Sequence, residues 1–105
     1  MTRARVQFDS AATAEAEAAA RWYEERGPGL GSDFLAELDR AVSEIARSPR
    51  SWQVSPDDSR ARRFVLSRFP FSIVYVMRAD DHVVVAAVAH AKRRPGYWRE
   101  RLGRP

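Results

Sequence analysis

The stretch RRFVLSRFPFSIVYVMRADDHVVVAAVAH, residues 62–90, decides the fold of this chain. It contains three runs rich in β-branched and aromatic residues, which predict three strands: residues 62–69, 71–77 and 83–89. Pro70 separates the first two runs, and the polar residues 78–81 suit a hairpin turn. The third run is apolar on both faces, as in a central strand that is covered on two sides. We therefore predict an antiparallel meander.

Two helices are predicted ahead of this meander. Residues 10–26 are rich in Ala and Glu, which favour helix, and the Gly-Pro-Gly run that follows ends it. Its apolar stripe is expected at Ala11, Ala14, Ala18 and Trp22, with its acids, including the pair Glu24 and Glu25, on a solvated face. A second helix over residues 32–47 has a clean stripe, consisting of Phe34, Leu38, Val42 and Ile45. The short link between them predicts an antiparallel helical hairpin.

One further strand, Arg3 to Phe8, precedes the helices, and residues 48–61 form a connecting loop. The order is strand, helix, helix, strand, strand, strand, which is typical of an α+β fold. We expect one domain over residues 1–105: an antiparallel sheet packed by the helical hairpin, the first strand beside a later one, and a short C-terminal helix or tail.

Composition excludes several classes of protein. There is no cysteine and there are two isolated histidines, so we expect neither a metal centre nor any other cofactor. No apolar run is long enough for a membrane span, and the N-terminus lacks a signal peptide, so a cytoplasmic protein is expected. Charge is uneven: seven Lys/Arg face eleven Asp/Glu through Ser59, whereas eleven face three from Arg60 onward. The C-terminal half is therefore expected to present a basic surface to a negatively charged partner.

The densest basic cluster follows the last predicted strand, in AAVAHAKRRPGYW, residues 86–98. A metal-free RNA-cleaving site needs a proton acceptor, a cation for the phosphate and a proton donor. His90, Arg93 and Tyr97 are the candidate catalytic residues, with Arg68 or Arg63 reaching in from a neighbouring strand. The candidate target-binding residues are Arg63, Lys92, Arg94 and Trp98. Alternatively, the two aromatic residues dock a terminal helix on the sheet, and His90 is a hydrogen-bonded boundary residue.

The sequence resembles the RelE/ParE superfamily of toxins from bacterial type II toxin–antitoxin modules, particularly its ParE-like, plasmid-stabilisation branch. The resemblance lies in WYEERGPGLGSDFLAELDRAV, SPRSWQ, RRFVLSRFPFSIVYVM and VVVAAVAHAKRRPGYWRER. It implies the α+β fold predicted above. RelE-like members are ribosome-dependent mRNA endonucleases, and the comparison with RelE points to Lys92, Arg93 and Tyr97. Where RelE has an arginine on the middle strand, this chain has Ser72. ParE-like members poison DNA gyrase.

The resemblance implies a growth-inhibiting toxin that a cognate antitoxin neutralises through an acidic segment. It also allows a heterotetramer of toxin and antitoxin. The helical hairpin favours gyrase as the target. The alternative is a metal-independent mRNA endonuclease acting on the ribosome, and a further alternative is a non-catalytic basic binding module or degenerate toxin. Ribosome and gyrase assays distinguish these hypotheses.

Overall fold

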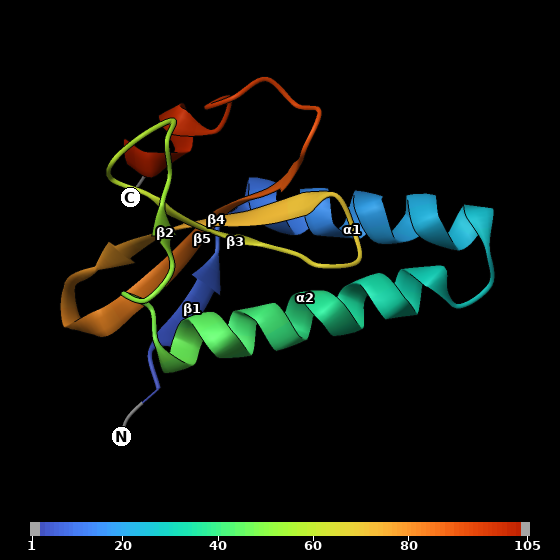
Figure 1. Ribbon diagram of the computed structural model, residues 1–105, viewed down its shortest axis with the longest axis horizontal. Coiled ribbons are helices and arrows are strands. Elements are labelled where there is room, and N and C mark those ends of the chain that lie inside the picture. Colours follow the sequence, from blue (N-terminus) through green and yellow to red (C-terminus); the bar gives the residue numbers. More distant parts are fainter. Residues whose placement is uncertain (1–2, 104–105) are drawn as a thin grey trace.

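The structure, a computed structural model, describes residues 3–103 (Figure 1). Its elements, in chain order, are β1 (Arg5–Phe8), α1 (Ser10–Arg26), α2 (Leu30–Arg47), β2 (Gln53–Val54), β3 (Arg62–Val65), β4 (Phe71–Arg78), the 3₁₀ turn η1 (Ala79–Asp81), β5 (His82–His90) and the 3₁₀ helix η2 (Arg99–Gly103). The predicted α+β class and order of elements are confirmed. β2 is an addition, because its two residues lie in the segment that was expected to be a loop.

The sheet has the strand order β1-β5-β4-β3-β2 and is mixed, not antiparallel throughout. β3, β4 and β5 form the predicted antiparallel meander, but β1 runs parallel to β5, with Arg5 opposite His82 and Phe8 opposite Val85. The helical hairpin explains this direction. It returns the chain to the end where β1 began, where the Ala4 amide donates to the Ala46 carbonyl at 2.9 Å. The meander then alternates, so that β5 runs in the same direction as β1.

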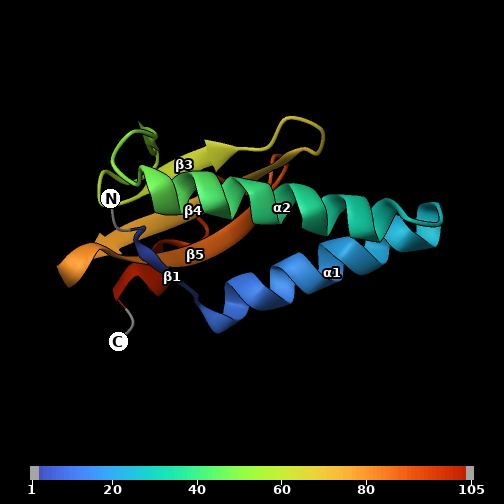
Figure 2. The ribbon, with the colours of Figure 1, turned by 90° about the horizontal axis from the view of Figure 1, so that it is seen from below.

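The two helices form the expected antiparallel hairpin on one face of the sheet (Figures 1 and 2). α1 begins after Asp9, whose carboxylate accepts from the Ala11 amide at 2.8 Å. α2 begins two residues earlier than expected, and the Glu24 carboxylate accepts from the amides of Gly29 and Gly31 at its N-terminus. Gly31 also permits the close helix contact, because a Cβ there would lie 2.6 Å from the Ala20 carbonyl oxygen.

The buried face of α1 differs from the one expected. The residues that it buries are Ala12, Ala16 and Ala19, whereas Trp22 is 50% exposed. Seven alanines in this helix give almost no contrast in hydrophobicity between faces, so periodicity alone points to the wrong stripe. The predicted stripe of α2 is largely confirmed: Phe34, Leu38 and Ile45 are buried, and Val42 is half-buried.

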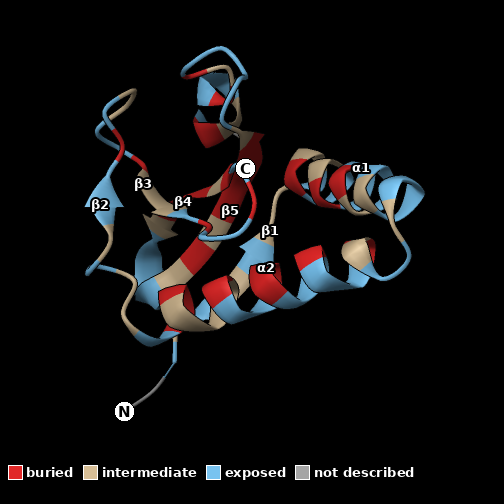
Figure 3. Ribbon diagram, turned by 45° about the vertical axis from the view of Figure 1, so that its right-hand side comes forward, coloured by how far each residue is buried: buried red, intermediate tan, exposed pale blue. Residues whose placement is uncertain are grey.

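Most residues of β4 and β5 are buried (Figure 3), and they belong to two core clusters, one on each face of the sheet. The helices cover one face, where Phe34 and Ile45 of α2 share a core cluster with Ile73 of β4. On the opposite face, Trp98 and Leu102 of the chain after β5 pack on Val74 and Ala87. The prediction of a last strand covered on two sides is therefore confirmed.

β3 ends at Val65, four residues before the end of the run that predicted it, because α2 holds the following loop. The Glu37 carboxylate oxygen Oε2 accepts from the amides of Ser67 and Arg68, at 2.7 and 3.1 Å, and from the Ser67 hydroxyl. Its other oxygen, Oε1, is buried without a hydrogen-bond partner among the described residues. Glu37 therefore fixes the chain between β3 and β4.

No helix within residues 3–103 is both long enough and apolar enough to cross a membrane.

Candidate functional site

The basic cluster begins where β5 ends. His90 is the last residue of the strand, and its Nδ1 accepts from the Lys92 amide at 3.0 Å. A nitrogen that accepts carries no proton, so a neutral His90 has its proton on Nε2. The ring also packs edge-on against Phe71, with centroids 5.0 Å apart. The alternative that His90 is a hydrogen-bonded boundary residue describes these contacts well.

Residues 91–103, which we call the C-terminal segment, fold back over the sheet face opposite the helices (Figure 1). The chain turns at Pro95 and Gly96, and Gly96 adopts a left-handed φ of 73°. This left-handed conformation favours glycine at position 96. The turn aims Tyr97 and Trp98 back at the sheet.

Tyr97 is tied to α1. Its hydroxyl donates to Oε2 of Glu15 at 2.7 Å. Burial, followed by this hydrogen bond and the negative charge of Glu15, raises the pKa of Tyr97 above its usual value. The Arg93 guanidinium lies over the Tyr97 ring, 3.9 Å from its centroid. Tyr97 is therefore a neutral phenol with one face covered by a cation.

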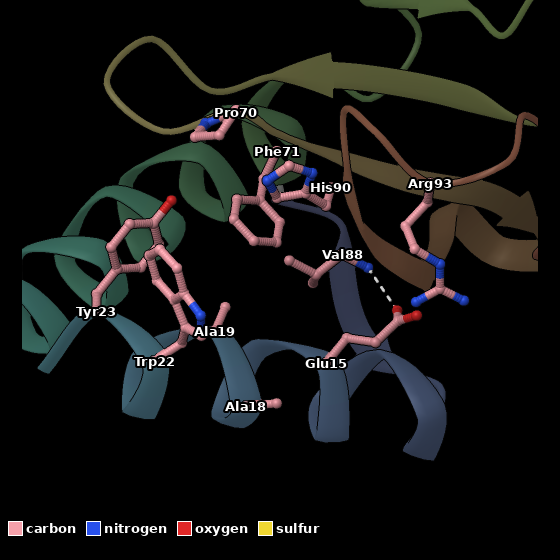
Figure 4. Close-up of a pocket in the computed structure, with 10 residues that line it drawn as sticks. All are labelled: Glu15, Ala18, Ala19, Trp22, Tyr23, Pro70, Phe71, Val88, His90 and Arg93. Carbon is pink, nitrogen blue, oxygen red and sulfur yellow. Dashed lines mark hydrogen bonds between the residues drawn. The ribbon is translucent and has the colours of Figure 1, made fainter. Parts of the chain in front are cut away.

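Two pockets flank this cluster. The larger, about 540 Å³, lies between α1 and the end of β5, and we call it the helix-side pocket (Figure 4). Its residues are Glu15, Ala18, Ala19, Trp22, Tyr23, Pro70, Phe71, Val88, His90 and Arg93. The smaller, about 230 Å³, is the sheet-face pocket, whose polar residues include Arg63, Ser72, His90, Arg93, Arg94 and Tyr97. His90 and Arg93 line both pockets, so they form the wall between them.

The two pockets differ in chemistry. The helix-side pocket is largely apolar, with Arg93 at one end (Figure 4), and its one acid, Glu15, is already bonded within the protein. It suits an apolar side chain of another protein. The sheet-face pocket has three arginines against one acid, Asp57, and suits an anion such as a phosphate or a carboxylate. We base the candidate site on the smaller pocket, because the cations gather there.

A model of the family described as "ParE toxin of type II toxin-antitoxin system, parDE" matches residues 6–95. The chain belongs to the ParE toxin family. It is a toxin of a type II toxin–antitoxin system, and the family implies an antitoxin partner. This confirms the assignment to the RelE/ParE superfamily.

Structural comparison agrees on the fold of this ParE-family chain. One similar solved structure is described as the chromosomal ParDE TA system from P. aeruginosa. Its matching chain superposes with a TM-score of 0.75 at 15% sequence identity, covering 86% of this chain and 98% of that one. A search of curated proteins found no match.

Most of the predicted site residues of this ParE-family toxin lie together. Arg63, His90, Arg93, Arg94 and Tyr97 all line the sheet-face pocket, although they come from two strands and the C-terminal segment. Their functional roles stay predictions.

Three other predicted residues are placed differently. Trp98 reaches the same pocket but is only 3% exposed, because its ring packs in the core between the C-terminal segment and the sheet. Lys92 is exposed and lines neither pocket. Arg68 also lines neither: it lies in the loop after β3, where its guanidinium is 3.6 Å from the Asp33 carboxylate.

Sequence reasoning missed Glu15 and Arg101. The acids of α1 were expected on a solvated face, but the Glu15 side chain is 16% exposed and accepts bonds from Arg101 at 2.9 and 3.1 Å. No local signal could have found Glu15, because the buried stripe of Ala12, Ala16 and Ala19 beside which it lies is not evident from the sequence. Among residues 3–103, no cluster of three His, Cys, Asp or Glu side chains could hold a metal ion.

Proposed function

We propose that this ParE-family toxin inhibits growth by binding DNA gyrase, with the cations around the sheet-face pocket as its contact surface. The observation that carries the proposal is the state of Tyr97. Its hydroxyl donates to Glu15, and its raised pKa keeps it protonated, so it is a poor general base and a weak acid. Arg63, Arg93 and Arg94 remain as an arginine-rich surface without that catalytic partner. Such a surface suits a binder of a negatively charged protein–DNA complex in the cytoplasm.

The test uses purified gyrase and plasmid DNA. The toxin should produce cleaved gyrase–DNA complexes, and Arg93→Ala should reduce them. A matched control is Arg50→Ala, which removes an exposed arginine that pairs with Asp81, away from both pockets. If plasmid remains intact at toxin concentrations that stop growth when the toxin is expressed, the proposal is wrong.

The alternative, ribosome-dependent mRNA cleavage, is favoured by one feature. His90, Arg93 and Arg63 meet around one pocket that also contains Ser72, so an imidazole and two guanidinium groups surround a space that could hold a phosphate. This enzyme would need no metal and would leave 2′,3′-cyclic phosphate ends. Purified ribosomes programmed with mRNA should then give codon-phased cuts, and His90→Gln should lower the rate by about 100-fold or more. A protein that neither cuts RNA nor traps gyrase would be the non-catalytic binding module.

We also propose that the antitoxin covers the helix-side pocket. Its apolar walls would bury an apolar side chain, with Trp22 half-exposed at its rim, and Arg93 at its end would attract an acidic residue. Trp22→Ala should weaken antitoxin binding by about tenfold or more, as expected for an interface aromatic anchor. Light scattering of the complex would show whether it is a heterotetramer. Unchanged affinity would place the antitoxin elsewhere.

A further inference from the structure

Glu15 joins three elements through one carboxylate. Its Oε1 accepts from the Val88 amide of β5 at 3.0 Å and from Nη1 of Arg101 at 2.9 Å. Its Oε2 accepts from the Tyr97 hydroxyl at 2.7 Å and from Nη2 of Arg101 at 3.1 Å. Both charged side chains are largely buried, Glu15 at 16% and Arg101 at 14% exposure. Both oxygens of this carboxylate are therefore satisfied, and the pair is bidentate.

Arg93 depends on this arrangement indirectly. The contact that the structure gives its guanidinium is the face of Tyr97, at 3.9 Å from the ring centroid. The hydroxyl of that ring is held by Glu15, and the Arg101 guanidinium lies 5.1 Å from the same centroid. A chain of contacts thus runs from Glu15 through Tyr97 to Arg93, which forms the wall between the two pockets.

We propose that Glu15 is a positioning residue, which holds the Arg93 guanidinium at the wall between the pockets by fixing the Tyr97 ring beneath it. This inference rests on the proposed function in that it takes Arg93 as a contact to the toxin's target. The family model matches residues 6–95, so Tyr97 and Arg101 lie after the matched residues. We call Glu15, Tyr97 and Arg101 the Glu15 cluster.

A merely structural role for Glu15 makes a different prediction. Other hydrogen bonds also hold the C-terminal segment to the rest of the protein. Arg78 donates to the Leu102 carbonyl at 2.9 Å, and Arg99 donates to the Asp57 carbonyl at 3.0 Å. Trp98 and Leu102 also remain packed on the sheet. A Glu15 variant should therefore keep the segment in place while releasing Tyr97. A structural role would change stability without changing the surroundings of Arg93.

The first test observes Arg93 by NMR in ¹⁵N-labelled full-length toxin without any target. Stacking on Tyr97 should shift the Arg93 side-chain signals upfield, and Arg93→Ala identifies them. In Glu15→Gln an NH2 group replaces one of the two oxygens, so one acceptor is left for the Val88 amide, Arg101 and the Tyr97 hydroxyl. The Arg93 signals should then move toward the positions of an exposed arginine. Glu17→Gln, at an exposed position of the same helix, is the matched control and should leave them unchanged. Unshifted Arg93 signals in folded Glu15→Gln would overturn the proposal.

Tyr97→Phe provides a second variant in case Glu15→Gln does not fold. It keeps the ring and loses only the bond to Glu15, so the Arg93 signals should again move. If these signals keep their wild-type positions, the Glu15 cluster does not position Arg93.

The functional arm is a double-mutant cycle in the gyrase assay. Arg93→Ala should weaken inhibition by about tenfold in the wild-type background but by less than about twofold in the Glu15→Gln background, because both changes act through one group. Fully additive losses would contradict the proposal. If the wild-type toxin leaves gyrase unaffected, the proposed function fails, and the NMR comparison still decides the role of Glu15.

Discussion

Glu37→Ala should remove the acceptor that holds the loop between β3 and β4. In the structure, one buried carboxylate oxygen accepts from two backbone amides and one hydroxyl of residues Ser67 and Arg68. Glu37 is 6% exposed, so water cannot easily replace it. The amides would be left without an acceptor in a partly buried loop.

The expected magnitude follows from these bonds. Each amide left without its acceptor costs about 1–3 kcal/mol, and some of that cost is recovered because a buried charge is also removed. A net loss of about 3 kcal/mol is expected, which lowers the urea midpoint by about 2 M at an m value of about 1.5 kcal/mol/M. Glu37→Gln should lose less stability than Glu37→Ala, because its amide oxygen can still accept hydrogen bonds from these backbone amides.

The assay is urea unfolding followed by tryptophan fluorescence, with Asp39→Ala as an exposed control on the same helix. Burial tends to raise the pKa of Glu37, but the hydrogen bonds from Arg68 and Ser67 outweigh it and lower that pKa. The stabilisation is therefore complete above the unfolded-state pKa of about 4.3 and is lost as the pH falls through the lowered value. The difference in the free energy of unfolding between wild type and Glu37→Gln should shrink as the pH falls from 5 to 3. A gap that does not change with pH, or a Glu37→Ala variant as stable as the control, would refute this reasoning.

Three further predictions concern other parts of the molecule. Arg93→Ala should greatly reduce growth inhibition in an inducible-expression assay while lowering the free energy of unfolding by no more than about 1 kcal/mol, because Arg93 is exposed and loses only its contact with the Tyr97 ring; unchanged toxicity would remove it from the site. Gly31→Ala should lower stability by about 1–3 kcal/mol in thermal unfolding, because its Cβ would lie 2.6 Å from a carbonyl of α1, whereas Gly103→Ala, which meets nothing within 4 Å, should have little effect. Burial raises the pKa of Tyr75 to about 12, so its contribution to stability should be lost as the pH rises from about 10 to 12; ultraviolet titration showing a normal phenol in the folded protein would contradict this.

The parts of the fold that could be predicted are those with strong local patterns. The stripe of α2 and the strands β4 and β5 have clear periodicity, and the Gly-Pro-Gly run between the helices allows only a tight link. The gathering of basic residues after β5 is also local, since it occupies consecutive positions. These patterns were sufficient for the α+β class and for the central position of β5.

The rest depends on contacts between distant residues. The parallel pairing of β1 is set by where the hairpin returns the chain, which no pattern within β1 indicates. Glu15 has its partners at Val88, Tyr97 and Arg101, and in an alanine-rich helix it looks locally the same as a solvated acid. The exposure of Trp22 has the same origin, because the helix face could not be assigned without its neighbours.

The pairing of β1 with β5 also bears on when this toxin can become harmful. Arg5 cannot meet His82 until nearly the whole chain has left the ribosome, and closing so long a loop is a slow, late event in folding. The helical hairpin can form early on its own local contacts, but the edge of the sheet and the cations that follow β5 cannot. If the cations after β5 bind the target as proposed, a nascent chain cannot yet act on it, and the interval before folding finishes gives an antitoxin time to be present first.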